Sequence, residues 1–212
     1  MTMKLLLATR NPGKMKEYHE ILADLPIEIT SLTAEGITQE VEETGCTFAE
    51  NALLKATTYA RISGLLTWAD DSGLEVDVLG GWPGVASARH AGVDATDEDR
   101  TRILLERLEG IPYEKRTAVF RCVVALATPE GRTWTASGAS SGVIIEEPRG
   151  EGGFGYDPVF YVPKYKRTYA QLTPEEKNVL SHRGRAALKA KVLLRRYLTG
   201  ALAGNKNAAV GD

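Results

Sequence analysis

The sequence predicts a single α/β unit, and three observations support this fold class. Short apolar runs of β-type residues alternate with stretches whose apolar residues recur at helical spacing, which is typical of α/β proteins. The 212 residues include 43% hydrophobic and 25% charged residues, which suits one substantial core. Nothing resembles a linker between domains, so we expect one domain over residues 1–200 and a flexible tail over residues 201–212.

The composition also excludes several classes of partner. A formal net charge of −2 gives no electrostatic reason to expect a nucleic-acid or membrane partner. The two cysteines, Cys46 and Cys122, form neither a disulfide framework nor a zinc-binding motif. The apolar run near the amino terminus is too short for a signal peptide, and no segment reaches transmembrane length. We therefore expect a cytoplasmic protein.

The chain begins with a predicted strand over residues 4–8, followed by a loop and a helix. Asn11 can cap this helix, and Pro12 suits its first position. Thr9, Asn11 and Lys14 add a hydroxyl, an amide and an ammonium to the free N–H groups of the helix start, which suits phosphate oxygens. The loop lacks the Walker A sequence, and a well-capped helix with a solvated lysine explains it equally well.

A second strand is predicted over residues 27–31, and a second helix follows it. Thr47 and Glu50 form a capping-box signature, and Gly64 ends the helix. Before this cap, Glu42 and Glu43 are either a solvated acidic pair or carboxylates directed at a cation. The helix is expected to place apolar residues inward and two polar residues on another face, namely Phe48, Ala52, Ala56 and Tyr59 and, separately, Asn51 and Lys55.

Two adjacent acids, Asp70 and Asp71, lie between the apolar runs of residues 65–69 and 74–78. We interpret these runs as two strands, so the acids are expected at a strand end. Carboxylates fixed there could hold Mg²⁺, which prefers oxygen ligands. Asp, Ser and Gly are also common turn residues, so a simple turn remains the alternative.

Two glycine-rich loops are expected to line a site. The first, residues 79–92, contains Arg89, which could reach a phosphate or pair with a surface acid, and His90, which we interpret only as a loop residue. The second, residues 150–158, carries Phe154 and Tyr156, which could offer a flat face to a base or cover the edge of the core.

The remaining elements are predicted from caps and periodicity. Thr96 with Asp99 opens a helix, residues 116–127 and 132–142 form a hairpin with Cys122 as a core thiol, and Thr173 caps a further helix. In the last helix we expect three residues to face inward and four charged ones outward, namely Leu188, Val192 and Leu193, and Lys189, Lys191, Arg195 and Arg196.

Six motifs, in order, resemble one family. They are Thr9-x-Asn11-x-x-Lys14; Glu42-Glu43-Thr44-Gly45 with Thr47-Phe48-x-Glu50-Asn51-Ala52-x-x-Lys55-Ala56; Ala69-Asp70-Asp71-Ser72-Gly73-Leu74; Gly80-Gly81-x-Pro83-Gly84 with Ser87-Ala88-Arg89; Gly152-Gly153-Phe154-Gly155-Tyr156-Asp157-Pro158; and Ser181-His182-Arg183-Gly184. Over nearly the whole chain except the tail, the sequence resembles the Ham1-like inosine/xanthosine triphosphate pyrophosphatases.

The resemblance implies a fold of two lobes around a long, curved mixed β-sheet flanked by helices, with the nucleotide cleft between the lobes. It implies hydrolysis of the purine nucleoside triphosphates ITP, dITP and XTP to monophosphate and pyrophosphate, with Mg²⁺ as cofactor, in a homodimer. Asp71 would be the catalytic base and, with Glu42, would hold Mg²⁺. Substrate contacts would come from Thr9, Arg10, Asn11, Pro12, Gly13, Lys14, Ser72, Phe154, Gly155, Tyr156, Asp157, Lys177, His182 and Arg183.

Selectivity would depend on the base. Hypoxanthine and xanthine carry a 6-oxo acceptor where adenine has a donating amine, so donors from Lys177, His182 or Arg183 would favour the oxo form. Arg10 could add a phosphate contact or point away. Two alternatives remain: a Maf-like pyrophosphatase acting on pyrimidine or modified nucleotides, and a nucleotide-sensing module without turnover.

Overall fold

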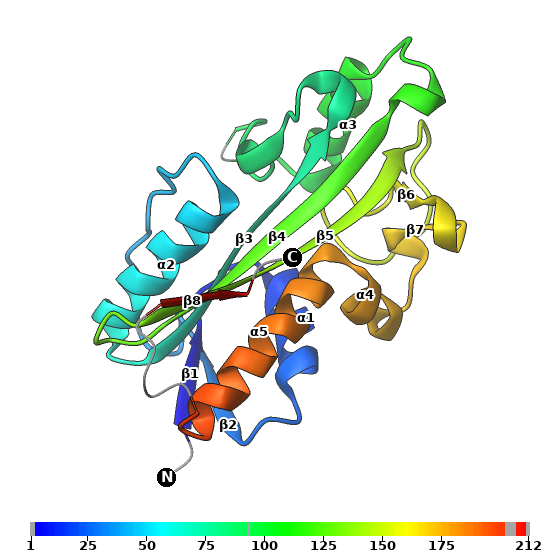
Figure 1. Cartoon of the computed structure of the whole chain (residues 1–212). Helices are drawn as coiled ribbons and strands as arrows, with labels where there is room; N and C mark the ends of the chain where they lie inside the picture. The colour runs from blue at the N-terminus through cyan, green and yellow to red at the C-terminus, as the bar shows by residue number, and fades with distance from the viewer. Residues whose placement is uncertain (1–2, 93, 202–206, 211–212) are drawn as a thin grey trace.

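The computed structural model describes residues 3–92, 94–201 and 207–210. It confirms an α/β fold with a mixed sheet, whose strand order is β2-β1-β3-β4-β5-β6-β7, with β8 beside β5 (Figure 1). The strands are β1 Met3–Leu7, β2 Ile27–Ser31, β3 Leu66–Val76, β4 Thr117–Ala127, β5 Thr133–Ile144, β6 Phe160–Val162, β7 Arg167–Thr168 and β8 Asn207–Val210. The α-helices are α1 Pro12–Leu22, α2 Phe48–Ser63, α3 Asp97–Arg107, α4 Pro174–Leu180 and α5 His182–Leu198.

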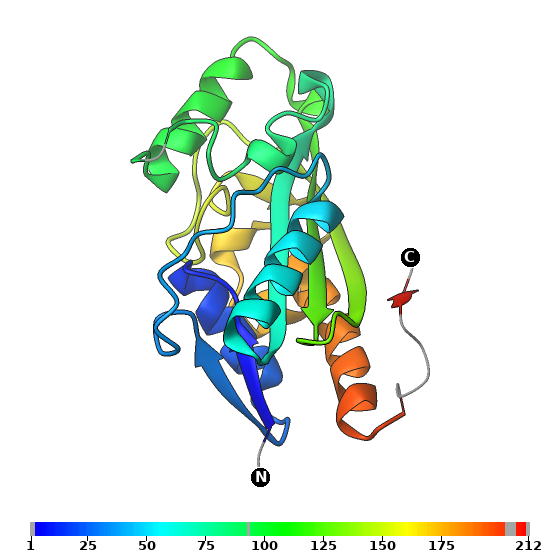
Figure 2. The ribbon, with the colours of Figure 1, turned by 90° about the vertical axis from the view of Figure 1, so that its left-hand side faces the viewer.

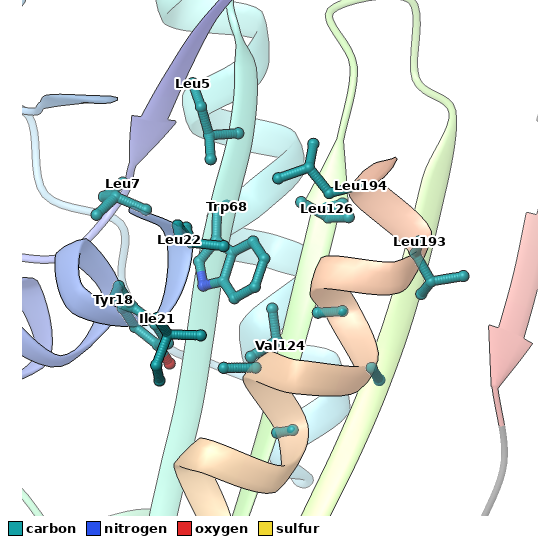
Figure 3. Close-up of a cluster of buried hydrophobic side chains, with 14 of the residues drawn as sticks. Leu5, Leu7, Tyr18, Ile21, Leu22, Trp68, Val124, Leu126, Leu193 and Leu194 are labelled. Atoms are coloured by element: carbon teal, nitrogen blue, oxygen red, sulfur yellow. The ribbon is translucent and has the colours of Figure 1, made fainter. Parts of the chain in front are cut away.

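Helices cover both faces of the sheet. In Figures 1 and 2, α2 lies on one face, and α5 with α1 lies on the other. The α1 and α5 side buries a core in which Trp68 of β3 meets Tyr18 of α1, with ring centroids 5.4 Å apart (Figure 3). On the α2 side, small residues such as Ala52 and Ala56 allow close packing, and both are buried as predicted. This part of the sheet, which forms the first lobe, is therefore packed against helices on both of its faces.

The second lobe is formed by the far ends of β3, β4 and β5. A separate core lies there, where Phe120 of β4 packs against Phe160 and Tyr169 at centroid distances of 4.6 and 5.7 Å. The three long strands thus run through both lobes and connect them (Figure 1).

The local signals for the helices are confirmed. Asn11 caps α1, Thr47 and Glu50 form both bonds of a capping box at α2, and Gly64 ends α2 at φ 67°. Thr96 and Thr173 also form the capping boxes that the sequence predicts. The side chain of Cys122 is buried in the core, as expected.

Two predictions about this architecture were wrong. The predicted strand end at Asp70 and Asp71 is the middle of β3, because every residue from Thr67 to Val76 pairs with β4. The Asp-Asp-Ser-Gly segment is therefore not a turn either. β3 has 11 residues and carries the two acids in its middle. Because the acids interrupt the apolar residues, the sequence pattern indicated two strands instead of one.

The predicted inward face of α5 is displaced. Leu193 is buried, but Leu188 and Val192 are 40% and 48% exposed. The buried stripe instead contains Ala186 and Ala190, because α5 lies close to the sheet and only small side chains fit there. Lys191, predicted outward, has a side chain only 12% exposed and donates to the Ile21 carbonyl at 2.6 Å.

The tail is partly described. Asn207–Val210 form β8, parallel to β5, whereas residues 202–206 and 211–212 of the predicted flexible segment lie outside the described residues. Over the part of the chain that the structure describes, no helix is both long and apolar enough to span a membrane.

Candidate active site

The site is built on a free edge of β3. The parallel strand β1 pairs with β3 only as far as Leu7 and Trp68, and the chain then turns into α1. Beyond this point the edge of β3 carries Asp70, Asp71 and Ser72. These side chains lie outside the carboxyl end of β1, which is where open α/β sheets usually bind ligands. The predicted strand end is therefore wrong for β3, which contains the acids, but the acids do lie next to the end of the neighbouring strand β1.

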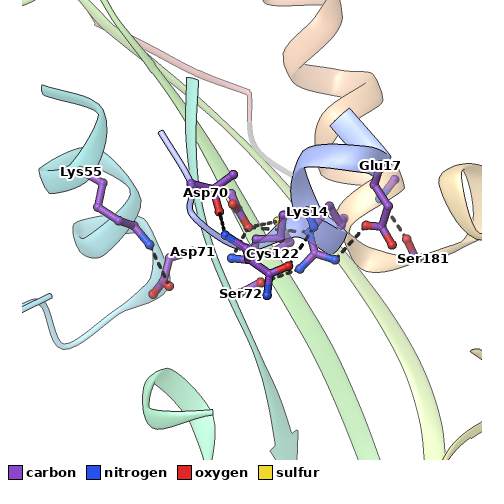
Figure 4. A network of polar contacts seen from close by, with 12 residues as sticks. Lys14, Glu17, Lys55, Asp70, Asp71, Ser72, Cys122 and Ser181 are labelled. Carbon is purple, nitrogen blue, oxygen red and sulfur yellow. Dashed lines mark hydrogen bonds and ion pairs between the residues drawn. The ribbon is translucent and has the colours of Figure 1, made fainter. Parts of the chain in front are cut away.

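Asp70 and Asp71 face opposite sides of the sheet, because successive side chains of a strand alternate. Asp70 Oδ2 lies 2.9 Å from Lys14 Nζ of α1. Asp71 faces α2, where Asn51 Nδ2 donates to Oδ2 at 3.2 Å. Lys55 Nζ of the same helix lies 3.3 Å from Oδ1 (Figure 4).

The two carboxyl groups consequently have opposite pKa shifts. Burial alone would raise the pKa of Asp70, but Lys14 and Arg183 outweigh it and hold the pKa at about 2. Burial raises the pKa of Asp71, and Lys55 only partly opposes this shift. Asp70 is therefore a permanently charged partner, whereas Asp71 is the more basic carboxylate of the pair.

A second carboxylate reaches the same cation as Asp71. Glu43 forms short ion pairs with both Lys55 and Arg89, so Arg89 has an acidic partner, one of the two fates that its sequence context left open. Glu43 lines the cavity described below, whereas Glu42, the predicted metal ligand, is exposed. Within the described residues, no group of three or more His, Cys, Asp or Glu side chains forms a ready metal site.

The loop before α1 is ordered by its own side chains. Thr9 Oγ1 accepts from the Asn11 amide at 3.2 Å, and Asn11 Oδ1 accepts from the Lys14 amide at 3.0 Å. Pro12 occupies the start of α1, and Gly13 faces the ring of Phe154: a Cβ there would lie 2.5 Å from Phe154 Cδ1. The loop and the second glycine-rich loop therefore meet directly.

The other end of the site is a buried charge network beneath Phe154. The Phe154 ring lies over Lys177 Nζ at 4.5 Å and over the Arg183 guanidinium at 5.0 Å. Lys177 lies between Asp157, at 2.5 Å, and Glu17, at 2.8 Å. Burial raises the pKa of Asp157 in spite of this lysine.

Arg183 and His182 complete this end. Arg183 donates to Ser72 Oγ at 3.0 Å and pairs with Glu17 at 2.9 Å. His182 stacks on Phe120 at 4.4 Å, and burial lowers its pKa well below the ordinary value, so the ring is neutral. Its Nδ1 is buried and has no protein partner among the described residues.

Both ends open into one cavity of about 250 Å³. Ten of the predicted residues line it: Asn11, Lys14, Asp71, Ser72, Phe154, Gly155, Tyr156, Asp157, His182 and Arg183. A smaller cavity of about 220 Å³ adjoins it through Lys14 and Glu43 and contains Thr9 and Arg10. Lys177 is buried behind Phe154.

Several residues of the site were not among the predicted ones. Glu17 forms ion pairs with both Lys177 and Arg183. Its position on α1, three residues after Lys14, is the sequence feature that could have identified it. Asp97 of α3 accepts from the Gly155 amide at 2.7 Å and pairs with Arg100, and both line the cavity. No local sequence pattern marks Asp97 or Arg100 as site residues, because the contact between Asp97 and Gly155 joins segments 58 positions apart.

The two glycine-rich loops also contact each other. Tyr156 donates its hydroxyl hydrogen to the Ser87 carbonyl at 3.0 Å, and His90 Nε2 lies 2.6 Å from the same hydroxyl. Since that hydroxyl has one hydrogen, Nε2 of His90 must carry the proton of the second bond. His90 is thus more than a loop residue: it fixes Tyr156 at the cavity wall.

Together, the fold and the site define an α/β protein with a charged cleft that has a carboxylate and lysine end and an aromatic end. The Ham1 family profile matches residues 5–192, and the chain belongs to this family. A dITP/XTP pyrophosphatase of Desulforamulus reducens is 54% identical over 92% of this chain and 96% of the relative. The corresponding Bacillus subtilis protein, also named dITP/XTP pyrophosphatase, is 49% identical over 89% of this chain and 96% of its own.

Solved structures agree with the fold. A HAM1 protein from Coxiella burnetii superposes with a TM-score of 0.83 at 43% identity, covering 92% of this chain and all of that one. The Ham1 protein of Staphylococcus aureus superposes with a TM-score of 0.81 at 39% identity, covering 92% of this chain and 99% of that one.

Proposed function

We propose that this protein is a nucleoside-triphosphate pyrophosphatase that hydrolyses ITP, dITP and XTP to the monophosphate and pyrophosphate. The observation that carries the proposal is the single cavity that joins Lys14 and Asp71 to Phe154 and Arg183. One end suits a triphosphate and the other suits a flat base, and the names of the relatives supply the chemistry of the substrate.

The donor set at Asp71 fits a hard divalent cation. Asp71 and Glu43 converge on the ammonium of Lys55, so two carboxylates already face a common positive charge. Oxygen ligands of this kind suit Mg²⁺, which would neutralise phosphate charge there. Glu42 was the predicted partner of Asp71, but the burial and contacts of Glu43 favour Glu43 for this role.

Asp71 is the residue we assign as general base. Burial raises its pKa, which makes it a better proton acceptor than an ordinary aspartate. It would accept a proton from the water that attacks the α-phosphorus, while the bond to the bridging oxygen breaks and pyrophosphate leaves. Lys14 and the amino terminus of α1 would stabilise the charge on the departing group.

The base would be selected by donors. Lys177 and Arg183 lie beneath the ring of Phe154, where a stacked base could replace part of the cation–aromatic contact. An oxo group at position 6 accepts from such donors, whereas the amine of adenine is itself a donor and cannot accept from them. Neutral His182 adds its unpaired Nδ1 to the same wall.

The alternatives are less well supported. The relatives named above are dITP/XTP pyrophosphatases, which favours purines over the pyrimidine nucleotides of a Maf-like enzyme. A sensing module without turnover would not need a basic carboxylate beside a triphosphate loop. The homodimer, the cytoplasmic location, the single domain and the flexible tail remain predictions.

The test is pyrophosphate release from ITP, dITP, XTP, GTP, ATP and dTTP with Mg²⁺ and with chelator. We expect metal-dependent turnover confined to ITP, dITP and XTP. Asp71→Asn should abolish turnover while dITP binding stays measurable by calorimetry. Turnover centred on pyrimidines, or near-normal turnover of the variant, would contradict the proposal.

A further inference from the structure

We propose that Arg10 is a positioning residue, which holds residues 37–43 against the phosphate loop and so places Glu43 opposite Asp71. It does not contact the triphosphate itself. This inference rests on the proposed function for its catalytic consequence, but its structural part can be tested without substrate.

The contacts of Arg10 are directed at the backbone of one segment. Its Nη2 shares its hydrogens among the carbonyl oxygens of Ile37, Thr38 and Gln39, at 3.3, 3.0 and 3.0 Å. Its Nε lies 3.8 Å from Glu40 Oε1. Hydrogen bonds from a charged donor are stronger than neutral ones, and a guanidinium cannot lose its proton at any relevant pH.

The segment needs such support because residues 37–45 are neither helix nor strand. At its start, Ile37 is 7% exposed and donates its amide to the Leu32 carbonyl at 2.8 Å. At its end, Glu43 is fixed by Lys55 and Arg89. Between these points, Val41 packs against the core on the α2 side. The described hydrogen bonds to this stretch from outside it come from Arg10 and from Tyr59, whose hydroxyl donates to the Gln39 carbonyl at 3.1 Å.

The same geometry argues against a phosphate contact. Arg10 and the segment line the smaller cavity together with two other cations, Lys14, which pairs with Asp70 of β3, and Lys55 of α2. Turning the guanidinium toward a phosphate would remove its bonds to three consecutive carbonyls. Lys14 and Lys55 can meet the anion without such a loss, because each ammonium has three N–H donors and its carboxylate partners use at most two of them.

Two consequences follow for catalysis. Without Arg10, residues 37–43 lose the hydrogen bonds that three consecutive carbonyl oxygens accept from one side chain, so Glu43 meets Asp71 in a smaller fraction of molecules. A metal held by both carboxylates would bind more weakly, whereas the triphosphate contacts of Lys14 would be unchanged. Loss of Arg10 should therefore raise the Mg²⁺ concentration for half-maximal activity more than the KM for dITP at saturating Mg²⁺.

The experiment compares Arg10→Met with Lys16→Met, a matched control that removes the same charge from an exposed position of α1. Amide hydrogen exchange of residues 37–45 is measured on the free, full-length protein, without metal or nucleotide. We expect exchange about tenfold faster in Arg10→Met and unchanged in Lys16→Met. In the activity assay, Arg10→Met should raise the half-saturating Mg²⁺ concentration about three- to tenfold, with KM for dITP within about twofold.

Unchanged exchange in Arg10→Met would overturn the proposal. A larger effect on KM for dITP than on Mg²⁺ activation would also overturn it, since that result marks a phosphate ligand. If the wild-type protein releases no pyrophosphate at all, the proposed function fails, and the exchange measurement still decides whether Arg10 holds the segment.

Discussion

At the scale of single residues, two neighbouring aspartates acquire different chemistry from their surroundings. Asp70 faces Lys14 and Arg183 and keeps its charge down to a pH of about 2. Asp71, on the opposite face of β3, meets Lys55 and Asn51 and has a raised pKa. The opposite pKa shifts of the two carboxyl groups therefore arise from strand alternation and from the helix on each side.

The raised pKa of Asp71 predicts the pH dependence of turnover. The base acts when ionised, so activity should fall as the pH falls through a pKa above the ordinary value of 3.8. Lys55→Met should move this acidic limb to higher pH, because the lysine is the main group that lowers the pKa of Asp71. The profile of kcat/KM for dITP measures the shift, and Lys16→Met serves as the control. A limb that does not move in Lys55→Met would contradict the assignment.

A second prediction at this scale concerns Lys177. Its ammonium lies beneath Phe154 between two buried carboxylates, where it could donate to a 6-oxo group. Lys177→Met should reduce kcat/KM for ITP about tenfold or more and should reduce any residual turnover of ATP, measured at high enzyme concentration, by a smaller factor. Thermal unfolding of the variant checks that it is folded. An equal loss on ITP and ATP would remove Lys177 from base recognition.

At the scale of elements, the site depends on how loops dock onto β3. The side chain of Ser87 accepts from the Leu74 amide at 2.9 Å and donates to the Gly84 carbonyl at 2.6 Å. This places the first glycine-rich loop directly over Gly73, where the strand has no side chain to separate them. A glycine is thus required at position 73, because the first glycine-rich loop approaches the backbone of β3 closely there.

Gly73→Ala tests this contact. A Cβ there would overlap the Gly84 carbonyl oxygen and lie 2.5 Å from Ser87 Oγ, so the loop must move. We expect a loss of about 1–3 kcal/mol in the free energy of unfolding and a lower kcat/KM for dITP. Urea denaturation measures the first quantity. Ser141→Ala, at an exposed position of β5, should change stability by less than about 0.5 kcal/mol; a Gly73→Ala protein as stable as this control would disprove the close contact.

At the scale of the whole molecule, Asp70 joins three elements that lie far apart in the sequence. It pairs with Lys14 of α1 at 2.9 Å and lies 3.8 Å from Arg183 Nε of α5. Figure 4 shows this network between the strand and the helices of one face. The smaller cavity and the packing of α1 and α5 on the sheet therefore share one buried anion.

Asp70→Asn should destabilise the protein by about 3–5 kcal/mol at neutral pH, because it leaves the partly buried Lys14 without its carboxylate and removes one of the two carboxylates beside the buried Arg183. The folded-state pKa of about 2 lies below the ordinary 3.8, so the stabilising effect is present above 3.8 and is lost as the pH falls toward 2. Denaturant unfolding at neutral and acidic pH measures the difference between the two proteins. A difference that stays constant through this pH range would contradict the role of the charge.

Much of this organisation could be predicted from local sequence. Asn11, Thr47, Thr96 and Thr173 mark helix starts because each cap is completed within three residues. The α/β class followed from hydrophobic periodicity, and ten predicted residues line one cavity because six motifs together resemble one family. Signals of this kind need no knowledge of distant partners.

The sequence by itself therefore determined the fold class, the helix starts and the group of residues that forms the cleft. Only the tertiary structure decided that β3 continues through the acids, that Glu43 rather than Glu42 faces Asp71, that Arg10 binds a backbone segment, and that α5 buries its alanines. The physical reason is the same in each case. These features depend on pairing, burial and charge contacts between segments that are distant in the chain, and no local pattern encodes which distant residue will be the partner.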